Sequence, residues 1–188
     1  MKVVVGLGNP GEEHKNNRHN VGFMVVDRMY NVQCTMYKLP LKFTFEKKFE
    51  AEICKIDNKL LLIKPQAFMN NSGKSVQAIL QYYKVKNMAD LIVVHDDLDL
   101  ELGRVKVEQK GGISGHHGIE SIINETGRND FVKVRVGIGR PQKKGNESCY
   151  YDITKNYLLS NFTPEEQEKV KNTIIKTLTL ITNYIKIK

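Results

Sequence analysis

The sequence has little that would support several common kinds of site. It holds three cysteines in 188 residues, Cys34, Cys54 and Cys149, and their positions show no metal-ligand spacing. A small, odd and scattered set indicates reduced thiols in a cytosol-like compartment, so we expect a cytoplasmic protein. No apolar run reaches the length of a membrane span, and no secretory signal pattern is present, so neither a membrane segment nor export by that route is expected.

Several familiar motifs are also missing. Without a Gly-x-Ser-x-Gly turn, catalysis by an activated serine has no support. The stretch Gly6–Gly11 lacks the spacing of the dinucleotide fingerprint and of the Walker loop, so a phosphate- or nucleotide-binding module would rest on one turn alone. The histidines and aspartates show no recognised ligand spacing, so we expect no metal and no other cofactor.

Positive charge is the clearest signal that is present. The chain has 29 Lys and Arg against 21 Asp and Glu, a formal net charge of +8. This excess favours a polyanionic partner such as nucleic acid, although a lysine- and asparagine-rich composition can produce it by drift alone. The length and a hydrophobic content of 40% predict one domain over residues 1–188 with a core that needs no disulfide. Nothing calls for a dimer, so a monomer is expected.

Short apolar runs alternate with amphipathic segments along the whole chain. Strands are predicted at Val3–Val5, at two segments or a hairpin between Phe43 and Ile53, and at Leu60–Ile63, Leu91–Val94, Arg104–Glu108 and Val132–Ile138.

Helix start signals lie between these strands. Asn20 is a candidate cap, Ser72 a candidate first residue, and Thr163–Glu166 combines a cap residue, a proline and a capping-box acid. The polar segment Lys143–Tyr150 is expected to be mobile. The alternation predicts an α/β fold, with a single three-layer α/β/α domain in which helices flank a twisted mixed β-sheet.

Four groups of polar residues follow the predicted strands or interrupt loops. Each has a plain structural interpretation, because a Gly-Asn-Pro-Gly turn is usually only a turn and a lone histidine is usually not catalytic. Their joint occurrence favours one site at the carboxyl edge of the sheet. An aspartate fixes the tautomer of a histidine that deprotonates water, and carboxamides orient a substrate. The groups are Asn9 with His19, and the segments 68–73, 95–99 and 115–118.

Taken together, these motifs resemble the bacterial-type peptidyl-tRNA hydrolase family, in family order and over nearly the whole chain. The matching stretches are Val5–Gly11 (VGLGNPG), Arg18–Gly22 (RHNVG), Phe68–Lys74 (FMNNSGK), His95–Leu100 (HDDLDL), Gly115–Gly118 (GHHG) and Arg135–Pro141 (RVGIGRP).

The resemblance implies hydrolysis of the ester that joins a peptide to the 3′ end of tRNA, with peptidyl-tRNA as the partner. It implies that His19 is the general base toward water, that Asp96 orients it, and that Asn9 belongs to the same catalytic set. It further implies two sets of binding residues: Met69, Asn70, Gly115, His116 and His117 for the terminal adenosine and peptide, and Lys106 and Arg135 for tRNA phosphate.

Three positions depart from the family pattern. His117 stands in place of an asparagine credited with positioning substrate or water, His14 stands where the family often has tyrosine, and Glu108 stands where many members are basic. The alternative is a non-catalytic RNA-binding relative with the same fold. The change at His117 favours that alternative, whereas the presence of His19, Asp96, Asn9 and Asn70 argues against it.

Overall fold

The structure is a computed structural model that describes residues 1–37, 41–109, 112, 115–141 and 150–187. The seven strands in these ranges belong to one mixed sheet. The strands are β1 (Lys2–Gly6), β2 (Thr44–Glu46), β3 (Ala51–Lys55), β4 (Leu60–Pro65), β5 (Leu91–Asp97), β6 (Val105–Glu108) and β7 (Val132–Gly137), in the spatial order β2-β3-β4-β1-β5-β7-β6.

The middle of the sheet is parallel and both of its edges are antiparallel. Strands β4, β1, β5 and β7 run in one direction, with Val4 of β1 level with Leu62 on one side and Ile92 on the other. The β2–β3 hairpin closes one edge and β6 closes the other. The carboxyl ends of the four parallel strands therefore meet at one end of the sheet, where ligands bind in open α/β folds.

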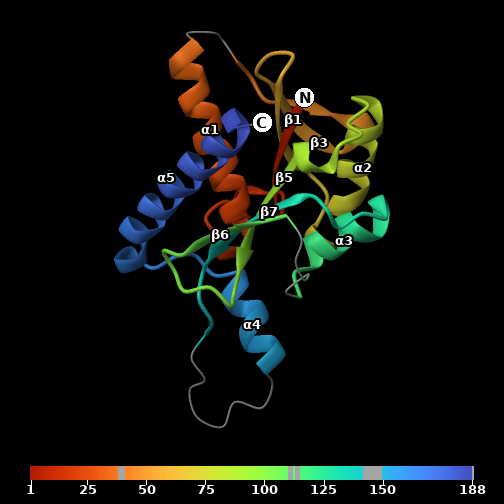
Figure 1. The fold of residues 1–188 in the computed structure, drawn as a ribbon. Helices are drawn as coiled ribbons and strands as arrows, with labels where there is room; N and C mark the ends of the chain where they lie inside the picture. The colour runs from red at the N-terminus through yellow and green to blue at the C-terminus, as the bar shows by residue number, and fades with distance from the viewer. Residues whose placement is uncertain (38–40, 110–111, 113–114, 142–149, 188) are drawn as a thin grey trace.

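Helices cover both faces of the sheet, as the alternation predicts. The helices are α1 (Val21–Tyr37), α2 (Ser72–Tyr82), α3 (His117–Thr126), α4 (Tyr150–Leu158) and α5 (Pro164–Ile187). Helices α1 and α5 pack on one face and α2 and α3 on the other (Figure 1). Alternate residues of β1 divide between the two cores, since Val3 and Val5 face α2 and α3 while Val4 faces α1 and α5. The predicted three-layer α/β fold is confirmed.

The fourth helix, α4, was not predicted and lies beyond the carboxyl edge of the sheet. Figure 1 shows it at this end of the molecule, with both chain termini at the other. Of the segment expected to be mobile, residues 143–149 lie outside the described residues, and Tyr150 begins α4. No helix within the described ranges combines the length and the apolar character needed to cross a membrane.

Two helix starts differ in how they are capped. At α5 the backbone N–H of Thr163 donates to Glu166 Oε2 at 2.8 Å, which is the back-bond of the predicted capping box. At α1 the prediction for Asn20 was wrong. Its amide makes a pair of hydrogen bonds with the backbone N–H and C=O of Asn9, each 2.9 Å long. Asn20 therefore holds the glycine turn against the start of α1.

Candidate active site

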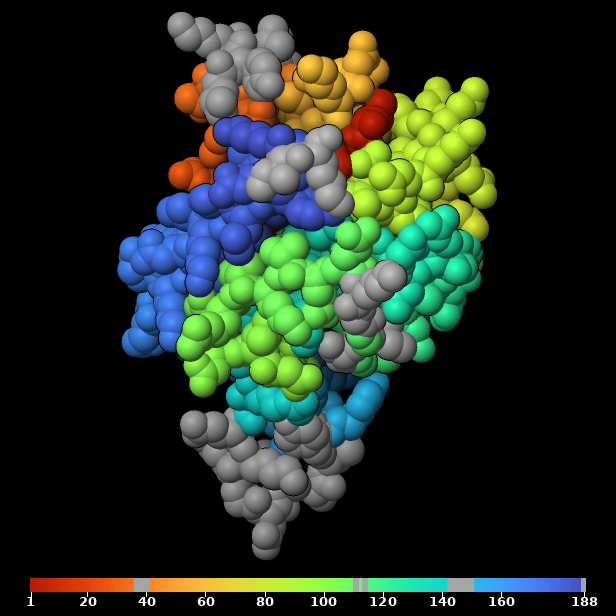
Figure 2. Space-filling model, in the orientation of Figure 1, coloured from red at the N-terminus to blue at the C-terminus, as the bar shows by residue number. Residues whose placement is uncertain are grey.

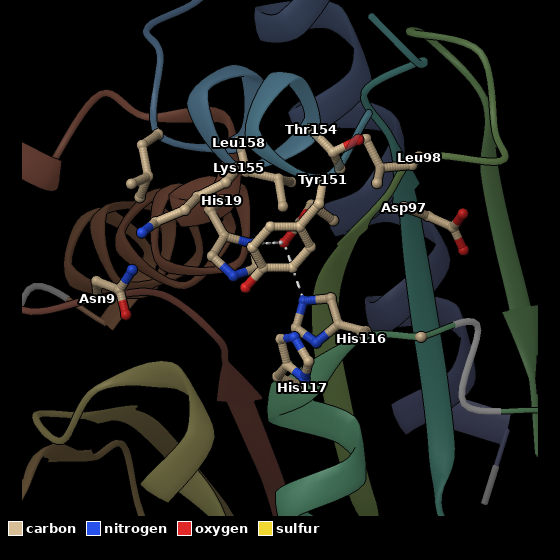
Figure 3. Close-up of a pocket in the computed structure, with 13 residues that line it drawn as sticks. Asn9, His19, Asp97, Leu98, His116, His117, Tyr151, Thr154, Lys155 and Leu158 are labelled. Carbon is tan, nitrogen blue, oxygen red and sulfur yellow. Dashed lines mark hydrogen bonds and ion pairs between the residues drawn. The ribbon is translucent and has the colours of Figure 1, made fainter. Parts of the chain in front are cut away.

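A cavity of about 420 Å³ opens at the carboxyl edge of the sheet. Six of the candidate site residues named from the sequence line it, four more residues come from α4, and Leu159 directly follows that helix. Figure 3 shows the α4 side chains on one side of His19, and His116 and His117 on the other. The lining residues are Asn9, His19, Asp96, Asp97, Leu98, Gly115, His116, His117, Tyr151, Thr154, Lys155, Leu158 and Leu159.

Two glycines let the segment that carries His19 approach the sheet closely. A Cβ on Gly6 would lie 2.3 Å from the carbonyl oxygen of Gly22, and a Cβ on Gly22 would lie 2.4 Å from that of Val94. Both distances are far below contact distance, so the start of α1 can sit this near β1 and β5 only with glycine at both positions. The short 3₁₀ turn before α1 then places His19 beside the end of β5.

The neighbouring Arg18 fixes this turn from behind. Its guanidinium makes a two-pronged ion pair with Glu166, with N–O distances of 3.0 and 2.6 Å. It also lies over the rings of Tyr157 and Phe162, at 4.3 and 4.8 Å from the ring centroids. Arg18 is buried. Its planar guanidinium stacks on the rings and pairs with both carboxylate oxygens, so it is held in one orientation more firmly than a lysine ammonium would be. The position of His19 is thus set by contacts with α4, α5 and the segment between them.

Asp96 lies between two imidazoles. Its Oδ1 is 2.8 Å from Nδ1 of His19 and 3.0 Å from Nε2 of His116. Its side chain is only 2% exposed, and the His19 ring lies 5.1 Å from the His116 ring. An ionised carboxylate only accepts hydrogen bonds, so both nitrogens that face it carry protons.

The charges in this cluster stabilise one another. Burial lowers the pKa of His19, but the charge of Asp96 and the hydrogen bond to it outweigh burial, so the pKa lies above the ordinary 6.5. Burial raises the pKa of Asp96, yet the interactions with His19 and His116 bring it far below the ordinary 3.8. Asp96 therefore stays ionised at neutral pH. Neutral His19 keeps its proton on Nδ1, which leaves the lone pair of Nε2 free to accept a proton from water.

His116 has a second task at the start of α3. Its Nδ1 accepts hydrogen bonds from the backbone N–H groups of Gly118 and Ile119, at 3.1 and 3.4 Å. The proton of neutral His116 is therefore on Nε2, where it donates to Asp96. The imidazole joins the helix cap to the carboxylate, and because both of its nitrogens are engaged, it lines the cavity as a group that positions Asp96 and not as a base.

His19, Asp96 and His116 also form the kind of cluster that could hold a metal ion. One ligand atom from each lies within 4.8 Å of the others. Binding a metal through Nε2 of His116 would move its proton to Nδ1, where two backbone N–H groups already donate. The helix cap would be lost, so the hydrogen-bond pattern fits a proton-handling cluster better than a metal site.

Asn9 lines the cavity with a defined amide orientation. Its Oδ1 accepts from the backbone N–H of Met69 at 3.0 Å, which leaves the NH₂ group as the donor available to a ligand. Met69 is buried and does not line the cavity, and Asn70 is exposed outside it. Met69 thus reaches the site through its backbone, and the free protein does not bring the Asn70 side chain to the cavity.

Gly115 and His117 line the cavity from the start of α3 and the residues just before it. Gly115 has a positive φ of 66°. The side chain of His117 is 67% exposed, and its Nδ1 lies 3.5 Å from a carboxylate oxygen of Glu120, one turn further along α3. His14, the other histidine that departs from the family pattern, does not line the cavity and is 3.2 Å from the amide of Asn17.

Lys106 and Arg135 lie apart from the cavity, on the antiparallel pair β6–β7, where they are directly opposite each other. Glu108 joins them, at 2.8 Å from Lys106 Nζ and 3.1 Å from Arg135 Nη1. Arg135 also pairs with Asp97, which lines the cavity. The two cations are therefore connected to the site through Asp97 but do not face into it.

The sequence pattern did not predict the cavity wall formed by α4, because this helix has few apolar residues. A signal was present: Tyr151, Thr154, Lys155 and Leu158 follow the i, i+3, i+4, i+7 spacing of one helix face. These residues, with Leu159, add apolar surface and one exposed ammonium group to the cavity. Apart from Leu98 and Gly115, its other lining residues have polar side chains.

Comparison with known proteins gives the same result by sequence and by structure. The family model described as "Peptidyl-tRNA hydrolase" matches residues 3–188. A protein of that name from Geotalea daltonii is 44% identical over 170 residues, covering 88% of this chain and 80% of its own length. One from Lactiplantibacillus plantarum is 42% identical, covering 96% and 91%. One from Aquifex aeolicus is also 42% identical, covering 100% and 91%.

The solved structures agree. The crystal structure of peptidyl-tRNA hydrolase from Acinetobacter baumannii is 26% identical and superimposes with a TM-score of 0.83, covering 99% of this chain and 89% of the other. Its Arg119Gln mutant is 27% identical and gives a TM-score of 0.82 with the same coverage. The glycine turn, the His19–Asp96 pair, the fold and the whole-length match agree that this chain belongs to the peptidyl-tRNA hydrolase family.

Proposed function

We propose that the chain hydrolyses the ester of peptidyl-tRNA, with His19 as the general base toward water. The reaction class follows from membership of the peptidyl-tRNA hydrolase family. The observation that supports the role of His19 is its 2.8 Å contact with the buried carboxylate of Asp96 at the wall of the cavity. That contact sets the tautomer and raises the pKa of the imidazole, which are the two requirements for a base that works near neutral pH.

The step that follows is ordinary ester hydrolysis. Nε2 of His19 removes a proton from water as the water oxygen attacks the ester carbonyl carbon. The imidazolium is held by the negative charge of Asp96. When the tetrahedral intermediate collapses, the C–O bond to the ribose breaks and the imidazolium returns its proton to the leaving oxygen. The free NH₂ group of Asn9 is available to donate to the substrate oxygen as it gains charge.

The binding roles form a second part of the proposal. In this proposal Met69, Asn70, Gly115, His116 and His117 bind the terminal adenosine and peptide, with Met69 acting through its backbone, His116 through Asp96, and Asn70 from outside the cavity of the free protein. Lys106 and Arg135 contact tRNA phosphate outside the cavity. This contact is independent of sequence and suits an enzyme that accepts many tRNAs.

We further infer that the chain acts as a monomer in the cytoplasm and folds as one domain over residues 1–188. The described strands share one sheet, which supports the single domain, and no sequence feature calls for a dimer. Light scattering on the purified protein, alone and with tRNA, tests the monomer directly.

The deciding experiment is hydrolysis of N-acetyl-aminoacyl-tRNA beside the unblocked aminoacyl-tRNA. Wild type should cleave the blocked substrate preferentially, because an unpaired buried amide penalises the free amine. His19→Ala should lower kcat by about 10²–10⁴-fold, the usual contribution of a positioned base. His14→Ala is the matched control, since His14 lies outside the cavity lining. Tight tRNA binding without hydrolysis by wild type would instead identify a non-catalytic RNA-binding relative.

A further inference from the structure

Glu108 occupies both cations of the proposed phosphate contact. One of its carboxylate oxygens is 2.8 Å from Lys106 Nζ, and the other is 3.1 Å from Arg135 Nη1. A phosphodiester presents two non-bridging oxygens in a similar fork, and charge-assisted pairs of this kind are the strong ones. Glu108 thus makes the contacts that a phosphate would make.

The four charged groups of this strip cancel. Lys106 and Arg135 carry two positive charges, and Glu108 and Asp97 carry two negative ones. These four groups therefore offer no net positive charge to RNA while Glu108 is in place, although the chain as a whole carries +8. Lys133 lies opposite Glu108 in the register, but its ammonium is buried and donates to Asn129. Removing the charge of Glu108 alone would leave a net charge of +1 there.

We propose that Glu108 is an internal substitute for a tRNA phosphate, which competes with the substrate for Lys106 and Arg135 and so limits how tightly tRNA is held. This inference rests on the proposed function, because it assumes that the two cations contact tRNA. It assigns a role to a residue that touches neither His19 nor the cavity.

The contacts show why Glu108 can be displaced while Arg135 stays in position. The side chain of Asp97 is 1% exposed and keeps its ion pair with Arg135, whereas that of Glu108 is 14% exposed and that of Lys106 is 56% exposed. Strand β6 is an edge strand, and its green surface lies open in the middle of the face shown in Figure 2. An incoming phosphate can therefore reach Lys106 first and then replace Glu108 on Arg135.

Electrostatics keep Glu108 ready for this exchange. Burial raises its pKa, but the hydrogen bond to Lys106 and the charge of Arg135 outweigh burial, so the pKa lies below the ordinary 4.5. The carboxylate is ionised at neutral pH. Partly exposed ion pairs contribute little and are screened by salt, so they can be exchanged for another anion at small cost.

The test is a salt titration of deacylated tRNA binding to wild type and to Glu108→Gln. The variant should bind tRNA about fivefold more tightly at moderate ionic strength, and the slope of log K against log salt should steepen by about 0.7–0.9. Glu46→Gln is the control, because it removes the same charge from β2 at the opposite edge of the sheet. Glu108→Ala should act in the same direction if the glutamine variant does not fold.

Lys106→Gln separates the two proposals. It should weaken tRNA binding. Adding Glu108→Gln to this variant should tighten tRNA binding less than the same change does in wild type, because one of the two cations is already gone. If Lys106→Gln weakens binding but Glu108→Gln binds no more tightly than Glu46→Gln, the competition by Glu108 is overturned and the phosphate contact stands. If neither variant at 106 nor at 108 changes binding, the phosphate contact fails as well.

Discussion

Two carboxylates in this molecule each lie between two nitrogen-containing side chains, and the two carboxylates differ in burial. Asp96 binds His19 and His116 with its side chain 2% exposed, whereas Glu108 binds Lys106 and Arg135 with its side chain 14% exposed. Asp96 uses one oxygen for both partners, and Glu108 uses one oxygen for each. The same type of contact therefore occurs once inside the protein and once near its surface.

The difference in burial gives the two contacts different functions. A buried ion that loses its partner costs several kcal/mol, so the contact around Asp96 is permanent and holds a fixed tautomer. On the Lys106 side the contact is exposed, since Lys106 is 56% exposed, and an exposed pair contributes on the order of 1 kcal/mol or less, so Glu108 can exchange with a ligand from that side. In our proposals, Asp96 organises a base, while Glu108 on β6 regulates access to two cations.

The largest effect should come from breaking the buried contact with Asp96→Asn. The amide cannot balance an imidazolium, and burial then lowers the pKa of His19 without opposition. We expect kcat for N-acetyl-aminoacyl-tRNA to fall by about 10²-fold or more, within the range for a positioned base.

Asp90→Asn is the matched control for this change. Asp90 lies just before β5, at the opposite end of the strand that carries Asp96, and its partner is Lys2. Steady-state kinetics with circular dichroism of both variants separates chemistry from folding. A kcat close to wild type in Asp96→Asn would show that the buried contact does not organise the base.

A smaller effect is expected from Arg135→Lys, which keeps the charge but removes the fork between Asp97 and Glu108. A lysine ammonium cannot reproduce two fixed, directed contacts. The KM for peptidyl-tRNA should rise about fivefold or more, since one charge-assisted hydrogen bond contributes on the order of 1 kcal/mol or more. The kcat at saturation should change less. An unchanged KM would mean that the arginine acts through its charge alone.

The smallest effect is expected at the mouth of the cavity. Neutral His117 offers one donor and one acceptor, as an asparagine side chain also can, so His117→Asn should change kcat by less than about threefold near neutral pH. The pH–rate profile of the variant should differ from that of wild type, because asparagine places no ionisable group beside the site. Superimposable pH profiles would exclude any contribution of His117 to the reaction, and loss of activity at every pH would contradict the substitution argument.

Much of the fold could be predicted because local patterns agree with tertiary structure. The apolar runs of β1, β4 and β5 are buried on both faces, and the capping box at Thr163 opens α5 as expected. Asn20 was misassigned because an asparagine side chain can either cap a helix or hydrogen-bond the backbone of a distant turn, and the sequence pattern is the same in both cases. Only the three-dimensional approach of Gly6 and Gly22 decides between them.

The candidate site was predicted in part for the same reason. Strand ends converge, so Asn9, His19 and Asp96 could be placed together from the sequence. The role of His116 as a helix cap depends on side-chain geometry across α3 and β5, and motif spacing does not contain it. The pairing of Glu108 with Lys106 and Arg135 depends on the β6–β7 register, which no local pattern specifies.

The pH dependence of kcat/KM for N-acetyl-aminoacyl-tRNA tests the central claim most directly. His19 acts as a base only when it is neutral, and the charge of Asp96 holds its pKa above 6.5. Activity should therefore fall as the pH drops, through a limb with its midpoint above 6.5, after spontaneous ester hydrolysis is subtracted. A midpoint well below 6.5, or activity that does not decline on acidification, would contradict an imidazole base held by a buried carboxylate.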